Sequence, residues 1–190
     1  KLAKKYKANI FVDDAHGIGT MGKTGAGTGE EQGVQDGIDV YFGTFAKAFA
    51  SIGGFISSTE DVVDYLRYNT RSQIFAKSMP MPLVLGNQKR LEMLRDQPEH
   101  KENLWKIVNA MQSGLRTSGF NLGVTNSCVT PIIMEGGVEE ATNMIFHIRE
   151  EYNLFTSVVV YPVVPKGTIL IRIIPTANHT LEDVDQTIEV

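Results

Sequence analysis

Two short segments combine residue types that can do chemistry, and each follows an apolar stretch. Residues 13–17 read DDAHG and come directly after the apolar run 10–12. Residues 43–49 read GTFAKAF and come after the run 40–42. Because open α/β sheets bind ligands at the carboxyl ends of their strands, we expect a functional site where these two segments meet.

The first segment has three competing interpretations: a metal site, a cofactor site, or a polar strand end that caps the following loop. Asp13 and Asp14 are adjacent in an expected strand and point to opposite faces, so at most one of them joins His16. The remaining histidines stand alone in the sequence: His100, His147 and His179. This disfavours a metal site and leaves the other two interpretations open.

The second segment places Lys47 among aromatic and alanine side chains, with Thr44 three residues earlier. Apolar surroundings disfavour a charged ammonium, so they would lower the pKa of Lys47 as a Schiff-base amine requires. Thr44 offers a hydroxyl and backbone groups to a phosphate. The alternative is a lysine that extends its amine into water from a loop edge, and the segment by itself favours that reading.

The two segments together indicate more than either alone. A carboxylate after one strand and a lysine after another, with glycine-rich loops between them, is the arrangement that pyridoxal 5'-phosphate (PLP) requires. The carboxylate keeps the pyridine nitrogen protonated, and the lysine holds the aldehyde carbon. We therefore predict a PLP site.

The same motifs resemble the α-oxoamine synthase family of fold-type I PLP enzymes. The segments that carry this resemblance are DDAHG at 13–17, glycines at 19, 22, 25 and 27, TFAK at 44–47, GG at 53–54, GTILIR at 167–172 and TANHT at 176–180. They run through nearly the whole chain and are similar to the C-terminal half of such enzymes.

The resemblance implies a role for each matching residue. Asp13 pairs with the pyridinium nitrogen, and His16 contacts the phenolic oxygen of the cofactor. Lys47 forms the Schiff base, and Thr44 contacts the phosphate. Arg172 pairs with the carboxylate of the amino-acid substrate, a role that suits a bidentate guanidinium.

Residues 73–78, which read QIFAKS, depart from the family pattern. The family usually has small hydroxyl residues here, one of which reaches the phosphate of the neighbouring subunit's cofactor. Ala76 has no hydroxyl, so we expect Lys77 or Ser78 to take over that contact. The family's histidine that stacks on the cofactor ring would lie upstream of Lys1, so we expect this chain to be a fragment.

The implied activity is the decarboxylative condensation of an amino acid with an acyl-CoA, by a homodimer with a shared active site. Residues 67–75, 78–82 and 161–167 most resemble bacterial serine palmitoyltransferases. Glycine C-acetyltransferase and 8-amino-7-oxononanoate synthase are the enzymatic alternatives. A plain aminotransferase and a catalytically silent homologue are further alternatives, although a silent homologue has no physical reason to keep Lys47.

Composition bounds the class of protein. The chain has 190 residues, of which 42% are hydrophobic and 21% charged, as in a globular protein with a sizeable core. A net charge of -4 argues against a nucleic-acid partner, and no apolar stretch approaches the roughly 20 residues of a membrane span. The single cysteine, Cys128, cannot form an internal disulfide, which is compatible with a cytoplasmic location, and we expect it to be buried.

Strands alternating with helices predict an α/β fold. We expect strands at 8–12, 40–43, 54–57, 131–134, 156–160 and 168–174, and a glycine-rich loop at 17–29. Helices are expected at 60–68, 78–95, 102–117 and 138–152, with a last one opening at Thr180 behind a capping box. A polar stretch at 96–101 predicts a boundary between residues 1–95, the second half of a PLP-binding large domain, and residues 96–190, the small C-terminal domain.

Overall fold

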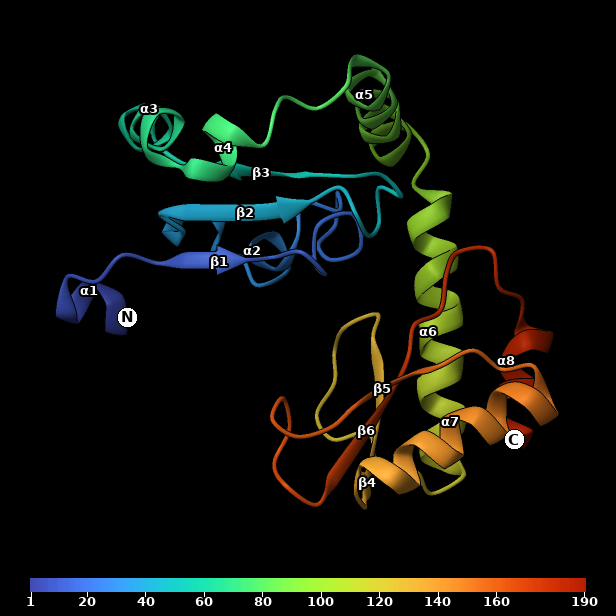
Figure 1. The fold of residues 1–190 in the computed structure, drawn as a ribbon. Helices are drawn as coiled ribbons and strands as arrows, with labels where there is room; N and C mark the ends of the chain where they lie inside the picture. The colour runs from blue at the N-terminus through green and yellow to red at the C-terminus, as the bar shows by residue number, and fades with distance from the viewer. The chain divides into compact units, whose positions relative to one another are not determined.

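The computed structural model describes residues 1–190 and forms two compact units, Lys1–Pro98 and Glu99–Val190 (Figure 1). The first unit contains a three-stranded sheet in the order β1-β2-β3. Its strands are β1 (Phe11–Asp13), β2 (Val40–Thr44) and β3 (Gly54–Ser57). β1 and β2 run parallel with Asp13 opposite Phe42, and β3 is antiparallel to β2.

Six helical segments accompany this sheet. They are α1 (Leu2–Tyr6), α2 (Thr28–Glu31), the 3-10 helix η1 (Gln35–Gly37), α3 (Glu60–Asn69), α4 (Arg71–Phe75) and α5 (Met81–Asp96). The long loop between β1 and α2 leaves the carboxyl end of β1, and the turn between β2 and β3 leaves the carboxyl end of β2. Both connections therefore lie at one edge of the sheet, where the site was expected.

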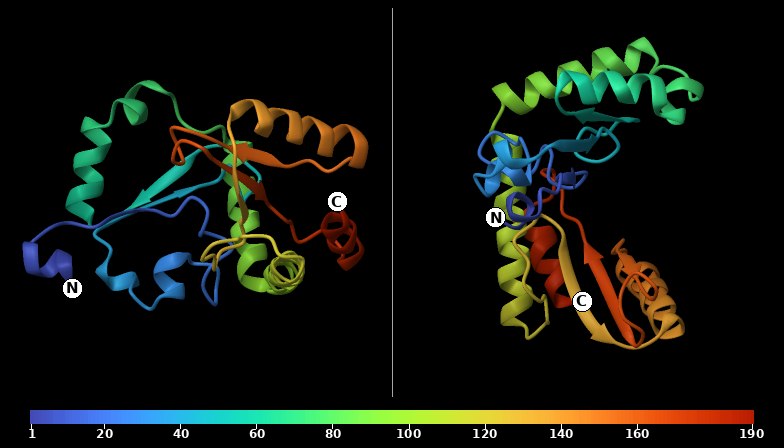
Figure 2. Two further views of the ribbon diagram at one scale, coloured as in Figure 1. Left: turned by 90° about the horizontal axis from the view of Figure 1, so that it is seen from below. Right: turned by 90° about the vertical axis from the view of Figure 1, so that its left-hand side faces the viewer.

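The second unit packs three helices on an antiparallel sheet in the order β4-β6-β5 (Figure 2). Its elements are α6 (Glu99–Thr117), β4 (Thr130–Glu135), α7 (Val138–Tyr152), β5 (Ser157–Val159), β6 (Thr168–Ile173) and α8 (Leu181–Glu189). One core joins them, with Ile107, Met111, Leu115, Leu122, Ile132, Ala141, Ile169, Ile171 and Val184 buried together. An apolar stripe on α6 supplies three of these side chains, Ile107, Met111 and Leu115.

The predicted α/β class is confirmed, and every predicted helix and strand is present, β3 and α7 with the predicted bounds and the others with shifted ends. β1 begins at Phe11 instead of residue 8, because its partner strand β2 begins at Val40, the register partner of Phe11. α5 begins at Met81 instead of residue 78, after Pro80. The short helices α2 and α4 were not predicted.

Two smaller expectations are also met. Thr180 and Asp183 form the predicted capping box at the start of α8. Cys128 is buried beside Leu104 and Val108. None of the helices combines the length and apolar character that a membrane span needs.

Candidate active site

Asp13 ends β1 and Asp14 follows it, and the two side chains have opposite orientations, as their spacing predicted. Asp13 is exposed, and its Oδ1 accepts a hydrogen bond of 3.1 Å from the backbone N–H of Ala15. No group of the chain donates to its second oxygen, Oδ2. Asp14 is only 3% exposed and faces the interior of the first unit. Asp13 is therefore the carboxylate that remains available to a ligand.

Asp14 is held by three donors. Its Oδ2 accepts from the Thr28 backbone N–H at 2.7 Å and from the Tyr41 hydroxyl at 2.9 Å, and its Oδ1 accepts from the Thr28 hydroxyl at 2.9 Å. Burial raises the pKa of Tyr41 above its ordinary value, and the hydrogen bond to Asp14 and the charge of Asp14 raise it further. This carboxylate ties β1 to β2 and to the start of α2.

Two glycines make room for the Asp14 carboxylate. A Cβ at Gly17 would lie 2.1 Å from Asp14 Oδ1, and a Cβ at Gly27 would lie 2.0 Å from Oδ2. Gly27 also has φ 106°, a backbone conformation that L residues rarely adopt. The glycine-rich sequence thus lets the loop backbone close around this buried charge.

Two further carboxylates fix the rest of the loop. Glu30 accepts hydrogen bonds from the backbone N–H groups of Thr24 and Ala26, and Glu31 accepts one of 2.9 Å from the Gly22 N–H. Side chains of α2 therefore satisfy loop backbone donors that have no strand partner.

The turn that carries Lys47 is closed by hydrogen bonds around Gly53. The Thr44 hydroxyl donates to the Gly53 carbonyl at 3.0 Å, and the Phe45 N–H donates to the same carbonyl at 2.9 Å. A phosphate contact from the Thr44 hydroxyl would require it to give up that bond. Ala50, at the end of the turn, has φ 44°, so this backbone is held in a sparsely populated conformation.

The expected apolar burial of Lys47 is wrong for this chain. The rings of Phe45 and Phe49 pack edge to face on each other, with centroids 5.6 Å apart, and the Lys47 side chain is exposed. The apolar residues of the turn stabilise the turn itself and do not cover the amine, which leaves Lys47 accessible.

The structure brings the two predicted segments together. Asp13 is opposite Phe42 in the parallel pair β1–β2, so Thr44 follows two residues later at the same sheet edge. The loop and the turn also touch, because a Cβ at Gly19 would lie 2.8 Å from the Cβ of Ala48. Asp13, His16, Thr44 and Lys47 are thus presented by two neighbouring connections.

Lys77 and Ser78 lie in the connection between α4 and α5, and both are exposed. Lys77 has φ 69°, which turns the chain toward α5. The next residue, Met79, approaches the Lys47 turn, since its Cε is 2.7 Å from where a Cβ at Gly53 would stand.

Arg172 belongs to the second unit, on the central strand β6. Its Nε donates to the Ser157 hydroxyl at 3.2 Å, and Ser157 is its register partner on β5. Pro131 is its register partner on β4.

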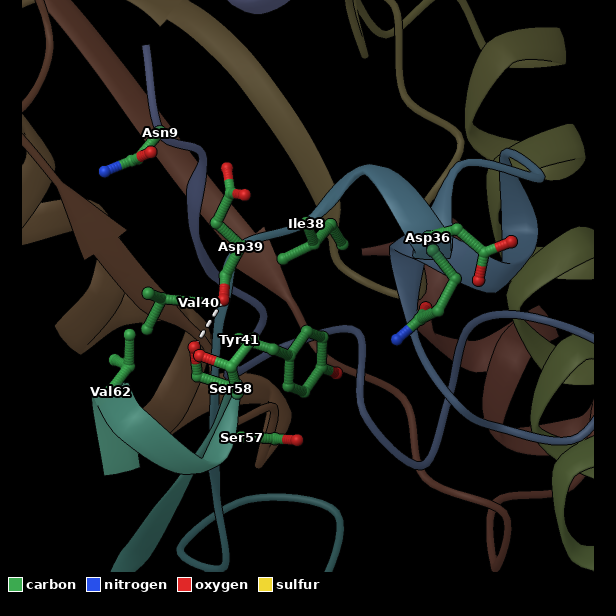
Figure 3. Close-up of a pocket in the computed structure, with 11 residues that line it drawn as sticks. Asn9, Asp36, Ile38, Asp39, Val40, Tyr41, Ser57, Ser58 and Val62 are labelled. Atoms are coloured by element: carbon green, nitrogen blue, oxygen red, sulfur yellow. Dashed lines mark hydrogen bonds between the residues drawn. The ribbon is translucent and has the colours of Figure 1, made fainter. Parts of the chain in front are cut away.

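Two cavities of the first unit are lined by other side chains, and the second borders Gly53 at the end of the Lys47 turn. One of about 590 Å³ is lined by Asn9, Asp39, Val40 and Ser57 among others, at the end of β1 and β2 opposite to Asp13 and Thr44 (Figure 3). Ser58 also lines it and donates to the Asp39 carbonyl at 2.6 Å (Figure 3). The second cavity, of about 360 Å³, lies between β2, β3 and the helices α3 and α4.

Neither cavity includes a predicted catalytic side chain, so the candidate site is recognised by its chemistry and not by its depth. The structure also provides no set of ligands for the metal site that was considered at residues 13–16. No group of three or more His, Cys, Asp or Glu side chains is placed to hold a metal ion.

Comparison with known proteins shows which family this chain belongs to. The model for the family described as aminotransferase class I and II matches residues 1–190. The chain belongs to this family. The resemblance to α-oxoamine synthases is confirmed by the relatives that the chain matches.

Three of these relatives carry different names. A cysteate-C-fatty acyltransferase of Capnocytophaga ochracea is 57% identical over 99% of the chain and 45% of its own length. A serine palmitoyltransferase of Sphingobacterium spiritivorum is 41% identical over 100% of the chain and 47% of its length. An 8-amino-7-oxononanoate synthase of Exiguobacterium sibiricum is 34% identical over 100% of the chain and 48% of its own length. The chain thus spans about half the length of these curated relatives.

A solved structure confirms the predicted fold-type I architecture. A serine palmitoyltransferase variant from S. paucimobilis with bound PLP–myriocin aldimine matches with a TM-score of 0.90 and 30% identity. The match covers 99% of this chain and 47% of that one.

Sequence reasoning missed the anchoring role of Asp14, Thr28 and Tyr41. The sequence offered only part of the signal, because alternation placed Asp13 and Asp14 on opposite faces without saying which of them is buried. A buried carboxylate needs donors, and Thr28 and Tyr41 are two of several hydroxyl residues in the loop and on the neighbouring strand that could have supplied them.

Proposed function

We propose that this chain is the C-terminal half of a PLP-dependent α-oxoamine synthase that condenses an amino acid with a fatty acyl-CoA. One observation supports this proposal above the others. The exposed Asp13 carboxylate and the exposed Lys47 amine lie on two adjoining connections, at the carboxyl ends of β1 and β2. The two units would correspond to the second half of the large domain and to the small domain.

The donors and acceptors at this edge fit PLP. Asp13 Oδ2 accepts no bond within the chain and suits a protonated ring nitrogen, while Lys47 offers an accessible amine for the aldehyde carbon. His16 would contact the phenolic oxygen, and Thr44 and the backbone of its turn would face the phosphate. When bound, PLP supplies an electron sink for the pair released as a Cα bond breaks.

The chain's own side chains then have separate tasks. The Asp13 carboxylate holds a proton on the ring nitrogen, which keeps the ring electron-withdrawing. The Lys47 amine moves a proton at the substrate Cα. Arg172 binds the amino-acid carboxylate, with Ser157 restraining its guanidinium through Nε. Lys77 or Ser78 would contact the cofactor phosphate of the second subunit in a cytoplasmic homodimer.

The relatives support a fatty acyl donor and rank two amino acids. Over almost the same residues, identity is 57% to the protein named as a cysteate acyltransferase and 41% to one named as a serine palmitoyltransferase. We therefore propose cysteate as the amino acid, and keep serine, the expectation from residues 67–75, as the second candidate. Both are α-amino acids with a small polar β substituent, and both would use the same Asp13, Lys47 and Arg172.

CoA release by the full-length, PLP-loaded parent protein tests this. Palmitoyl-CoA is offered with cysteate, serine, glycine or alanine, and acetyl-CoA with glycine and pimeloyl-CoA with alanine serve as the competing pairs. A preference for palmitoyl-CoA with cysteate supports the proposal, and a preference for serine selects the second candidate.

Other outcomes overturn it. Preference for acetyl-CoA and glycine, or for pimeloyl-CoA and alanine, would assign one of the alternative synthases. Amino-group transfer to an oxo acid without CoA release would assign an aminotransferase. No reaction with any pair by a PLP-loaded protein would indicate a catalytically silent homologue.

A further inference from the structure

We infer that Asp14 is a positioning residue: its buried carboxylate fixes the glycine-rich loop, residues 17–29, so that Asp13 and His16 keep their orientation toward the cofactor. This inference rests on the proposed function. It concerns the second aspartate of the DDAHG segment, which points away from the face where the cofactor would bind. Asp14 therefore acts on the site only through its neighbours.

The backbone of Asp14 joins the site residues to the sheet. Its N–H donates to the Phe42 carbonyl at 2.9 Å, and its carbonyl accepts from the N–H groups of Gly17 and Ile18, both at 3.0 Å. His16 lies inside this short turn, and its own carbonyl accepts from the Thr20 hydroxyl at 2.7 Å. The path of the chain at Asp13 and His16 is thus set on both sides of Asp14.

The side chain extends this link to the far end of the loop. Thr28, where α2 begins, donates to both carboxylate oxygens, and Tyr41 donates from the neighbouring strand. A single carboxylate therefore connects the residues before the loop, the last part of the loop and the neighbouring strand. No ion pair involves Asp14, so hydrogen bonds alone compensate its buried charge.

The backbone of the loop packs directly against this carboxylate. Gly17 and Gly27 place backbone where any Cβ would overlap an Asp14 oxygen. Removal of the carboxylate would leave the Thr28 N–H and the Tyr41 hydroxyl without that acceptor in a buried place. The loop would then have to move to satisfy them, and the turn with Asp13 and His16 is part of the same backbone.

The test compares three substitutions in the full-length parent protein. Asp14→Ala removes all three hydrogen bonds. Asp14→Asn keeps them, because its amide oxygen can accept from the Thr28 N–H and the Tyr41 hydroxyl while its NH₂ donates to the Thr28 hydroxyl. Tyr41→Phe removes one of them without changing the shape of the ring. Asp36→Ala, at an exposed carboxylate of the same unit, is the control.

Three measurements are made on each protein: the dissociation constant of PLP, the pH dependence of the bound cofactor's visible absorbance, and amide hydrogen exchange over residues 17–29 in the cofactor-free protein. Asp14→Ala should weaken PLP binding by about tenfold, shift the spectral titration and speed exchange throughout the loop. Tyr41→Phe should do the same to a smaller extent, about threefold in affinity. Asp14→Asn and Asp36→Ala should match the unsubstituted protein in all three.

A purely structural role predicts a different result and would overturn the inference. In that case Asp14→Ala and Tyr41→Phe lower the thermal midpoint while the PLP affinity, the spectral titration and exchange in the loop stay unchanged. If Asp14→Ala does not fold, the contrast between Tyr41→Phe and Asp14→Asn decides. If the unsubstituted protein shows no visible cofactor band, the proposed function fails, and loop exchange still reports whether Asp14 fixes the loop.

Discussion

The close approach of Gly17 to the Asp14 carboxylate gives a quantitative prediction for Gly17→Ala. The added Cβ would stand 2.1 Å from Asp14 Oδ1 and 2.7 Å from its Cγ, far inside van der Waals contact, so the carboxylate must move by about 1 Å or more. Overpacking of this kind costs about 1–3 kcal/mol, and a weakened hydrogen bond to a charged acceptor adds about 1–2 kcal/mol. We expect a loss of roughly 2–5 kcal/mol.

Gly37→Ala is the matched control, because nothing lies within 4 Å of its Cβ and its φ is not positive. That change should leave stability within about 0.5 kcal/mol or raise it slightly. The assay is the thermal midpoint of the full-length parent protein without cofactor, where Gly17→Ala should lower the midpoint by roughly 5–10 °C relative to Gly37→Ala. Equal midpoints for the two variants would refute the idea that the position of Asp14 is fixed.

Three further predictions concern single side chains of the parent protein. Lys47→Ala should abolish the visible cofactor band and reduce CoA release to background, whereas Lys4→Ala, at an exposed lysine of α1, should change neither. Arg172→Lys should raise the KM for the amino acid by roughly tenfold and leave the KM for the acyl-CoA unchanged, because an ammonium lacks the planar, bidentate donor geometry of a guanidinium. An equal rise in both KM values would contradict the assigned role. The pKa of Asp183 lies below its ordinary value, since the Thr180 N–H and hydroxyl donate to the carboxylate. Because the folded-state pKa is the lower one, this stabilisation is complete above about pH 4 and fades as the pH falls through the folded-state pKa. Thermal midpoints between about pH 2.5 and 6 should therefore fall less steeply for Asp183→Asn than for the unsubstituted protein, and parallel curves would count against this.

Much of the fold was readable because local patterns coincide with tertiary structure here. The stripe on α6 and the capping box at Thr180 specify their helices by spacing alone. The short helix α2 was missed because it begins after Gly27, inside a stretch whose glycines indicate irregular backbone. Its first residue, Thr28, donates to Asp14, a contact across 14 residues that no local pattern contains.

The candidate site was predictable in its residue types and less so in its environment. Alternation along the strand placed Asp13 and Asp14 on opposite faces, and the family resemblance selected Asp13 as the carboxylate that faces the cofactor. The setting of Lys47 was not predictable, because Phe45 and Phe49 had each other as partners and left the amine exposed. The sequence shows which side chains are close to a residue along the chain. Whether those side chains bury the residue depends on tertiary packing.

The three-stranded sheet of the first unit has a consequence for how that unit behaves outside a larger assembly. β1 and β3 each pair only with β2, so the outer edge of each carries backbone donors and acceptors with no strand beside them. Phe11 on β1 is 60% exposed and Ile56 on β3 is 38% exposed, which adds apolar surface to both edges. Such edges are templates for strand addition. Residues 1–98 produced alone would therefore be expected to self-associate edge to edge, and light scattering that grows with protein concentration would be the sign of it.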